Sequence, residues 1–219
     1  MNALANDLVA LLGALAWYNL CLTVSAIVIA LPIACLFAVG RLSRSPFVYY
    51  PVTAYVNILR SSPLLMIMFW VYYSGPMITG APTSAYTAAL IALAAFEVAY
   101  FTELVRAGLQ SIASGQRDAA LAAGLRPSQA MRFVILPQAL RRMLPSLLSQ
   151  SIIAFQDSTI ASVIGVTDIF ATANIISARE QRPIELYTAL AAIFFVLCYG
   201  LSKLVRALEA RVSARTAGA

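Results

Sequence analysis

The sequence predicts an all-α integral membrane protein with about five transmembrane helices. The first observation is composition, because 61% of the 219 residues are apolar and only 11% are charged. Soluble domains carry roughly 25% charged residues, so this balance indicates a membrane protein. The second observation is spacing, because a span needs about 20 apolar residues and the chain contains five such runs. Little sequence lies between them, which leaves no room for a soluble catalytic domain.

We expect a single transmembrane domain over residues 1–219. The apolar runs, and the Gly, Pro and charged residues that end them, place spans at 18–39, 49–73, 85–108, 144–166 and 183–201. The second span is the least regular. Its clean apolar run, 64–73, is too short to cross a bilayer, so the span has to include 49–57 and Arg60, with Pro63 just after this Arg. Ser74-Gly75-Pro76 is expected to close this span.

Three segments lie outside these spans. Residues 1–17 lack the positive stretch of a cleaved signal peptide, so we expect them to remain and to lie at the membrane surface before the first span. Residues 167–182 are expected to form a polar loop. Residues 109–143 form the longest interruption and are rich in Arg.

The basic residues set the predicted orientation. Twelve of the 15 fall on one side of the membrane and two, Arg179 and Arg182, on the other, with Arg60 inside a span. The positive-inside rule makes the side with twelve cytoplasmic. The N-terminus is then outside and the C-terminus inside. We read the net charge of +6 as topology and not as a nucleic-acid surface.

The loop after the third span has the sequence features of a short helix. Ser114 is a good N-cap, Asp118 is expected in the first turn, and an alanine-rich run follows. Gly124 stands where such a helix ends, and Pro127 follows at the usual distance. We therefore expect a short cytoplasmic helix whose alanine face can approach another protein closely.

Four charged residues fall inside the spans and away from their first and last turns, where each costs roughly 2.5 to 3.5 kcal/mol. They are Arg60, Glu97, Glu103 and Asp157. Such groups are expected to face the bundle interior or a water-filled cavity. Two interpretations stay open: the charges neutralise one another, as Glu103 and Arg106 can on one helix face, or they line a substrate pathway in which Arg60 pairs with a carboxylate.

Several motifs make the chain resemble the membrane subunits of ABC importers. Asp118-Ala119-Ala120, Gly124 and Val134-Ile135-Leu136-Pro137 resemble the EAA motif, with Asp118 where the family usually has Glu. Arg60-Ser61-Ser62-Pro63-Leu64-Leu65 and the stretch 97–108 resemble signatures of polar amino acid permeases. Within these, Phe96-Glu97 and Phe155-Gln156-Asp157 look most like the glutamate/aspartate import permeases.

The resemblance implies an ABC type I importer permease fold in a bacterial inner membrane. It implies ABC ATPase subunits, a periplasmic amino-acid-binding protein and a second permease subunit, the same chain or a related one, as partners. Two residue sets follow. The coupling helix that docks on the ATPase is expected to use Asp118, Ala119, Ala120, Gly124, Leu136 and Pro137. Candidates for the substrate pathway are Arg60, Ser61, Ser62, Glu97, Tyr100, Gln156, Asp157 and Ser158.

No cofactor, metal or catalytic residue is expected on this chain. The sequence has no phosphate-binding G-x-x-x-x-G-K-S/T loop and no His, so ATP is expected on the partner. Cys21, Cys35 and Cys198 all lie in apolar spans and are expected to pack.

Two other function classes are alternatives. An ion-gradient-driven secondary transporter would also explain buried carboxylates, although no internal repeat supports it. A membrane enzyme would use Glu97, Glu103 and Asp157 as acid and base, but no nucleophile accompanies them. An acidic substrate also faces three carboxylates and one Arg inside the spans, a tension that the sequence leaves open.

Overall fold

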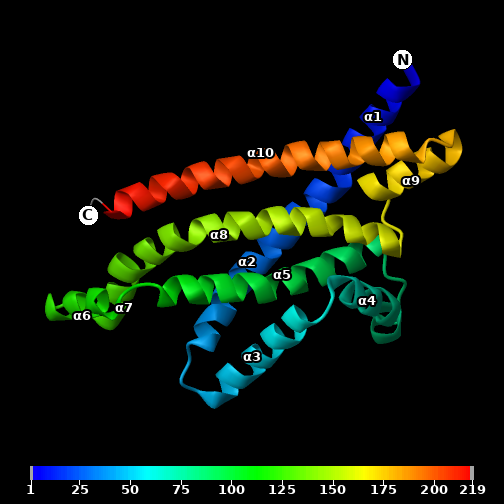
Figure 1. Cartoon of the computed structure of the whole chain (residues 1–219). Coiled ribbons are helices and arrows are strands. Elements are labelled where there is room, and N and C mark those ends of the chain that lie inside the picture. The colour runs from blue at the N-terminus through cyan, green and yellow to red at the C-terminus, as the bar shows by residue number, and fades with distance from the viewer. Residues whose placement is uncertain (1, 218–219) are drawn as a thin grey trace.

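A computed structural model of the chain shows a bundle of long helices (Figure 1). The structure describes residues 2–217, with side chains for 6–210, and within this range it contains helices and turns but no strand. The elements are α1 (Asn2–Ala14), η1 (Leu15–Leu20), α2 (Cys21–Arg41), α3 (Pro46–Ser61), α4 (Leu64–Thr79), α5 (Ala85–Gln110), α6 (Ser114–Ala122), α7 (Pro127–Ala130), η2 (Met131–Ile135), α8 (Leu136–Asp157), η3 (Ser158–Ile164), α9 (Ile169–Glu180) and α10 (Pro183–Ala217).

The first helix is longer than predicted. A continuous apolar helix runs from Asn6 to Arg41 through the π-helical turn η1. The predicted separation of this segment from the first span is therefore wrong, while its place at the membrane surface stays a prediction. No proline interrupts this stretch before Pro32, and the inner face of α1 has its own partner, since Leu11 and Ala14 pack in one buried cluster with Ala173 and Ile176 of α9.

The second predicted span is two helices. α3 and α4 meet at a bend of 108° between Ser61 and Leu64. Pro63 has no N–H to donate, and the residue before a proline avoids the helical region. Ser62 is accordingly extended, with φ −104° and ψ 139°. The expected closure at Ser74-Gly75-Pro76 is also wrong, because α4 continues through Pro76 to Thr79.

α5 is the centre of the bundle, and α2 lies along it in the same direction. Four alanines of α2 at every fourth position, Ala26, Ala30, Ala34 and Ala38, are fully buried. Along α2 they meet successively later parts of α5, as three buried clusters show. Such a stripe of small residues lets two membrane helices approach closely.

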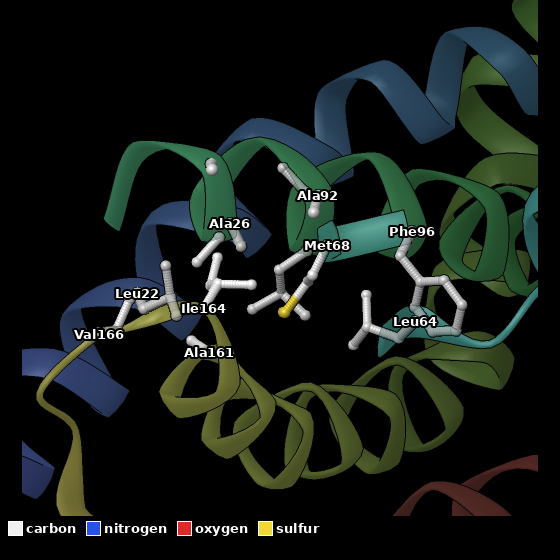
Figure 2. Packing of buried hydrophobic residues seen from close by; sticks show 13 residues of the cluster. Leu22, Ala26, Leu64, Met68, Ala92, Phe96, Ala161, Ile164 and Val166 are labelled. Carbon is white, nitrogen blue, oxygen red and sulfur yellow. The ribbon is translucent and has the colours of Figure 1, made fainter. Parts of the chain in front are cut away.

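Because α2 and α5 run parallel, the chain between them has to return to the other end of the bundle. The bent pair α3/α4 makes this return, so it counts as one crossing. With the four long apolar helices this gives up to five candidate crossings among the described residues. Figure 2 shows where the elements converge: side chains of α2, α4, α5 and η3 meet in one buried cluster that includes Leu22, Met68, Ala92, Phe96 and Ile164.

The segment predicted as a loop followed by a span at 144–166 is mostly one helix. It runs without a break from Pro127 to Ile164. Pro137 fits because it stands in the first turn of α8, directly after a π-helical turn in which the Leu136 N–H donates to the Met131 carbonyl. α8 runs antiparallel to α5, and the two approach closely where Gly108 faces Met143.

The predicted polar loop 167–182 is also largely helical. It contains α9, whose N-terminus is capped by Asp168. α10 begins at Pro183 as predicted but continues far beyond Leu201, to Ala217. α10 packs on α8 and α9 along the edge of the bundle (Figure 1).

Candidate functional site

The short helix α6 forms where the alanine run predicts it and ends at Gly124. Gly124 has a φ of +84°, in the left-handed region. Its N–H donates to the Leu121 carbonyl at 3.0 Å, and the Leu125 N–H donates to the Ala120 carbonyl at 3.1 Å. These two bonds form a Schellman motif, in which a residue with a Cβ is strained. The backbone thus fixes the end of α6 at the tip of the bundle (Figure 1).

The start of α6 differs from the prediction. Ala113, not Ser114, stands at the N-cap, because its carbonyl already accepts from the Gln116 N–H at 3.0 Å. Ser114 is the first helical residue and makes no side-chain cap. Asp118 therefore lies beyond the first turn.

The predicted coupling residues divide into one buried and five exposed residues. Ala120 is buried. The exposed ones are Asp118, Ala119, Gly124, Leu136 and Pro137. Gln138 of α8 donates to the Gln116 side chain at 3.2 Å, and Arg142 donates to the Ser111 carbonyl at 2.5 Å. These bonds tie α6 and the loop before it to α8, a long helix of the bundle.

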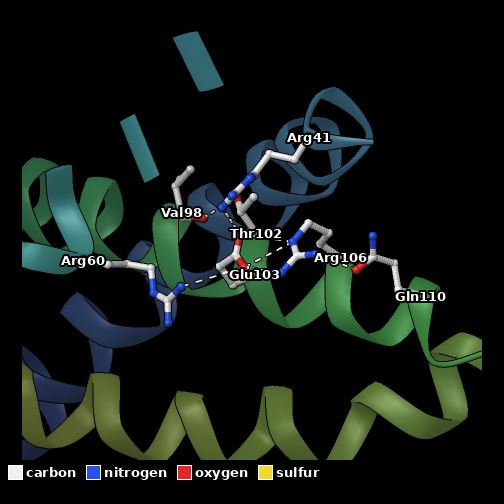
Figure 3. A network of polar contacts seen from close by, with 7 residues as sticks. All are labelled: Arg41, Arg60, Val98, Thr102, Glu103, Arg106 and Gln110. Atoms are coloured by element: carbon white, nitrogen blue, oxygen red, sulfur yellow. Dashed lines mark hydrogen bonds and ion pairs between the residues drawn. The ribbon is translucent and has the colours of Figure 1, made fainter. Parts of the chain in front are cut away.

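A cluster of charges joins α2, α3 and α5 around one carboxylate (Figure 3). Glu103 pairs with Arg41, accepts from Arg106 Nη2 at 2.7 Å, and lies 3.8 Å from Arg60 Nη1. The Arg60 guanidinium also lies over the Tyr100 ring, 5.3 Å from its centroid. We call Arg41, Arg60, Glu103 and Arg106 the Glu103 cluster. The expected pair of Glu103 with Arg106 is present, and it is part of this larger group.

A second carboxylate, Glu97, lies deeper in α5. It is fully buried, and Gln150 of α8 donates to both of its oxygens at 3.2 and 3.3 Å. Asp157 is half-buried and Gln156 exposed at the end of α8. The hydroxyl of Ser62 donates to the Ile58 carbonyl at 2.8 Å, and Ser61 is exposed beside the break between α3 and α4.

Ser158 belongs to a different set of contacts, centred on Asn19 of η1. Asn19 donates to Ser158 Oγ at 3.0 Å and to Asp168 Oδ2 at 3.3 Å, and accepts from the Ile169 N–H at 3.1 Å. The Thr23 hydroxyl donates to the Asn19 carbonyl at 2.7 Å. We call these residues the Asn19 network. It joins the first helix to η3 and to the start of α9.

Asp168 is the charged member of this network. It caps α9 by accepting from the Ala171 N–H at 2.8 Å. Burial raises the pKa of this carboxyl, and the hydrogen bonds from Ala171 and Asn19 oppose that shift.

The structure therefore brings some pathway candidates together and separates others. Arg60 and Tyr100 meet at the Glu103 cluster, while Ser158 is engaged in the Asn19 network. Sequence reasoning missed Asn19 and Asp168 and left Arg41 in a loop. A lone Asn inside an apolar run is itself a signal, because its amide needs buried partners. Among the described side chains no group of His, Cys, Asp and Glu is arranged to hold a metal ion.

Comparison with known proteins identifies the family of this chain. Residues 8–214 match the family described as "Binding-protein-dependent transport system inner membrane component". This chain belongs to that family. The fold agrees, because the structure superposes with a TM-score of 0.89 on a solved amino acid ABC transporter with histidines, at 33% identity over 95% of this chain and 97% of the other.

Curated relatives of the family are amino acid permeases. The chain is 38% identical over 199 residues to the glutamate/aspartate import permease protein GltK of Escherichia coli O6:H1, covering 88% of this chain and 89% of the relative. It is 36% identical over 176 residues to the probable glutamine ABC transporter permease protein GlnP of Bacillus subtilis, covering 78% and 79%.

This membership confirms the predicted class. The chain is an ABC type I importer permease for amino acids, a multi-pass inner-membrane protein, and a transport subunit whose ATPase is a separate chain. Its family implies that ATP is used by that ATPase and that a binding protein is a partner.

Proposed function

We propose that this permease imports glutamate and aspartate. The observation that carries the proposal is its similarity over most of its length to a glutamate/aspartate import permease. The glutamine permeases among its relatives make glutamine the competing substrate. The structure supports an acidic substrate to this extent: Arg60, a pathway candidate, is partly exposed beside the break between α3 and α4.

In this proposal the α6 end of the bundle faces the cytoplasm, where most basic residues lie, so the N-terminus is outside. α6 is the coupling helix: Asp118, Ala119, Ala120 and Gly124, with Leu136 and Pro137 beside them, form the surface that an ATPase subunit contacts. Two permease subunits, the same chain or a related one, form the path. ATP binding on the ATPase moves α6, and the bonds from α8 pass this movement to the spans.

The remaining pathway candidates have proposed roles of different kinds. Arg60 pairs with a substrate carboxylate, next to Tyr100, Ser61 and Ser62 at the break. Glu97, Gln156 and Asp157 supply polar contacts farther along the path. Ser158 has no direct contact with the substrate in this proposal; its role is to hold the neighbouring residue, Asp157, in position.

Uptake of labelled glutamate tests the substrate. Cells lacking only this gene are compared with cells in which it is restored, with unlabelled aspartate, glutamine and arginine as competitors. Restored uptake that aspartate blocks and the other two do not is the expected result. If restoring the gene leaves glutamate uptake unchanged, the acidic substrate is wrong; glutamine then becomes the substrate to test.

A pair of glycines tests the coupling role of α6. Gly124→Ala places a Cβ in a left-handed conformation, whereas Gly115→Ala, in the first turn of the same helix, meets no neighbour and no positive φ. We expect Gly124→Ala to lower uptake about tenfold with normal membrane insertion, and Gly115→Ala to transport like the unmodified protein. Equal transport by the two variants would contradict the coupling role.

A further inference from the structure

The Glu103 cluster holds more positive charge than its one carboxylate neutralises. Three guanidinium groups surround Glu103, and within the described side chains no other carboxylate comes within 4 Å of Arg41, Arg60 or Arg106. The other acidic group of α5, Glu97, is engaged with Gln150. Formal charges therefore leave the cluster with an excess of two positive charges.

The three arginines are held very differently. Arg106 donates to Glu103 Oε2 from Nε at 3.1 Å and from Nη2 at 2.7 Å, and to Oε1 from Nε at 3.3 Å. Arg41 also pairs directly with this carboxylate. Their side chains are 28% and 13% exposed. Arg60 lies 3.8 Å away, beyond hydrogen-bond distance, and its side chain is 42% exposed. The excess charge is therefore available at Arg60.

Arg60 lies far from the α6 end of the bundle, at a depth where an exposed positive charge is unusual. Its guanidinium lies over Tyr100, which stands ten residues before the end of α5. At about 1.5 Å per residue, that is about 15 Å from the α6 end of the helix. An exposed cation at such depth is unfavourable in lipid, so it faces water or an anion.

The position in the chain leaves Arg60 free to change partner. It is the second-last residue of α3, two residues before the extended Ser62. The aromatic face of Tyr100 stabilises its charge without using its N–H donors. Those donors remain able to form the paired bonds that a guanidinium makes with a carboxylate.

We infer that the Glu103 cluster is an anion site whose ligand is a carboxylate of the transported amino acid, bound through Arg60. Glu103 is the resident counter-ion: it fixes Arg41 and Arg106 and sets how strongly the cluster attracts a second anion. For Glu103 this answers the tension between an acidic substrate and an intramembrane carboxylate, because Glu103 is neutralised and the local charge is positive. The inference rests on the proposed function, since it names the substrate group that this pathway residue binds.

Equilibrium dialysis of the purified permease–ATPase complex against labelled L-glutamate, without binding protein, tests the site. Arg60→Gln removes the ligand-binding cation and is expected to weaken glutamate binding about tenfold or more. Glu103→Gln removes the competing anion and is expected to tighten it several-fold. Arg44→Gln, in the exposed turn after α2, is the matched control and is expected to bind like the unmodified complex.

Opposite shifts in the two variants support the inference. Equal affinities in the unmodified and Arg60→Gln complexes, or no glutamate binding at all, overturn it. Native mass spectrometry gives a separate arm for lipid: loss of phosphatidylglycerol in Arg60→Gln with unchanged glutamate binding assigns the site to a headgroup and also overturns it. Uptake by intact cells is measured in parallel, so that a wrong site with intact glutamate import is distinguished from a wrong substrate.

Discussion

The Asn19 network and the Glu103 cluster each tie three segments together, but in opposite ways. Asn19 is fully buried, and both ends of its amide meet a partner within 3.3 Å. The Glu103 cluster is partly exposed and has more donors than its one acceptor can use. A satisfied buried network fixes one arrangement, whereas an ionic cluster with a surplus charge can respond to a ligand. We therefore expect mutations in the Asn19 network to act mainly on stability. Mutations in the Glu103 cluster are expected to act less on stability and more on transport.

The largest effect on stability is expected from Asn19→Leu. It leaves the buried Ile169 N–H without its acceptor, and it removes the amide that donates to Ser158 Oγ and to Asp168 Oδ2, both also buried. A cost of about 3 kcal/mol in the free energy of unfolding is expected, measured by SDS-induced unfolding of the purified complex. Trp17→Leu, on the exposed side of the same turn, should change little. Equal stability of the two variants would show that the network does not hold these segments.

Glu103→Gln comes next, because it removes the counter-charge of Arg41 and Arg106. We expect the free energy of unfolding to fall by about 2 kcal/mol, which is less than for Asn19→Leu because water reaches part of this cluster. The same unfolding assay measures it. A variant as stable as the unmodified protein would mean that the arginines are already solvated and that Glu103 does not fix them.

Ser158→Ala removes one member of the Asn19 network and keeps the rest. Asn19 still donates to Asp168 and still accepts from Ile169, so a loss of about 1 kcal/mol is expected. The double variant Asn19→Leu/Ser158→Ala sharpens this result. Adding Ser158→Ala to Asn19→Leu should lower the free energy of unfolding by less than Ser158→Ala does alone. The reason is that both changes remove the same hydrogen bond.

The smallest effect on stability is expected from Arg60→Gln. Arg60 makes no hydrogen bond to Glu103 at 3.8 Å and is partly exposed, so the free energy of unfolding should change by less than about 0.5 kcal/mol. Glutamate uptake should nevertheless fall. A loss of stability comparable to that of Glu103→Gln would make Arg60 a structural ion-pair partner and remove the contrast between the two regions.

The sequence predicts this fold well where one segment carries its own signal. Apolar runs located the long helices, and the Ala-rich stretch before Gly124 located α6. The sequence does not predict contacts between residues that are far apart in the chain. Asn19 finds Ser158 139 residues away, which no local pattern indicates. Arg41 follows an apolar run and was placed in a loop, yet it pairs with Glu103 inside the bundle.

Two prolines have opposite effects on the helices that contain or adjoin them, for a physical reason. Pro63 breaks the second span, because Ser62 before it becomes extended. Pro137 does not break α8, because it stands in a first turn where its missing N–H has no helical partner to serve, after a π-helical turn. A sequence shows the proline but not the backbone bonds before it, so the helix from Pro127 to Ile164 was divided too early.

The central claim is that this chain moves an acidic amino acid with energy from ATP on a partner at its α6 end. The most direct test is uptake of labelled glutamate by proteoliposomes that contain the permease, its ATPase and its binding protein. Uptake that requires ATP on the side of α6 and continues in the presence of an uncoupler is the predicted result. Uptake without ATP that an ion gradient drives and an uncoupler abolishes would contradict the account.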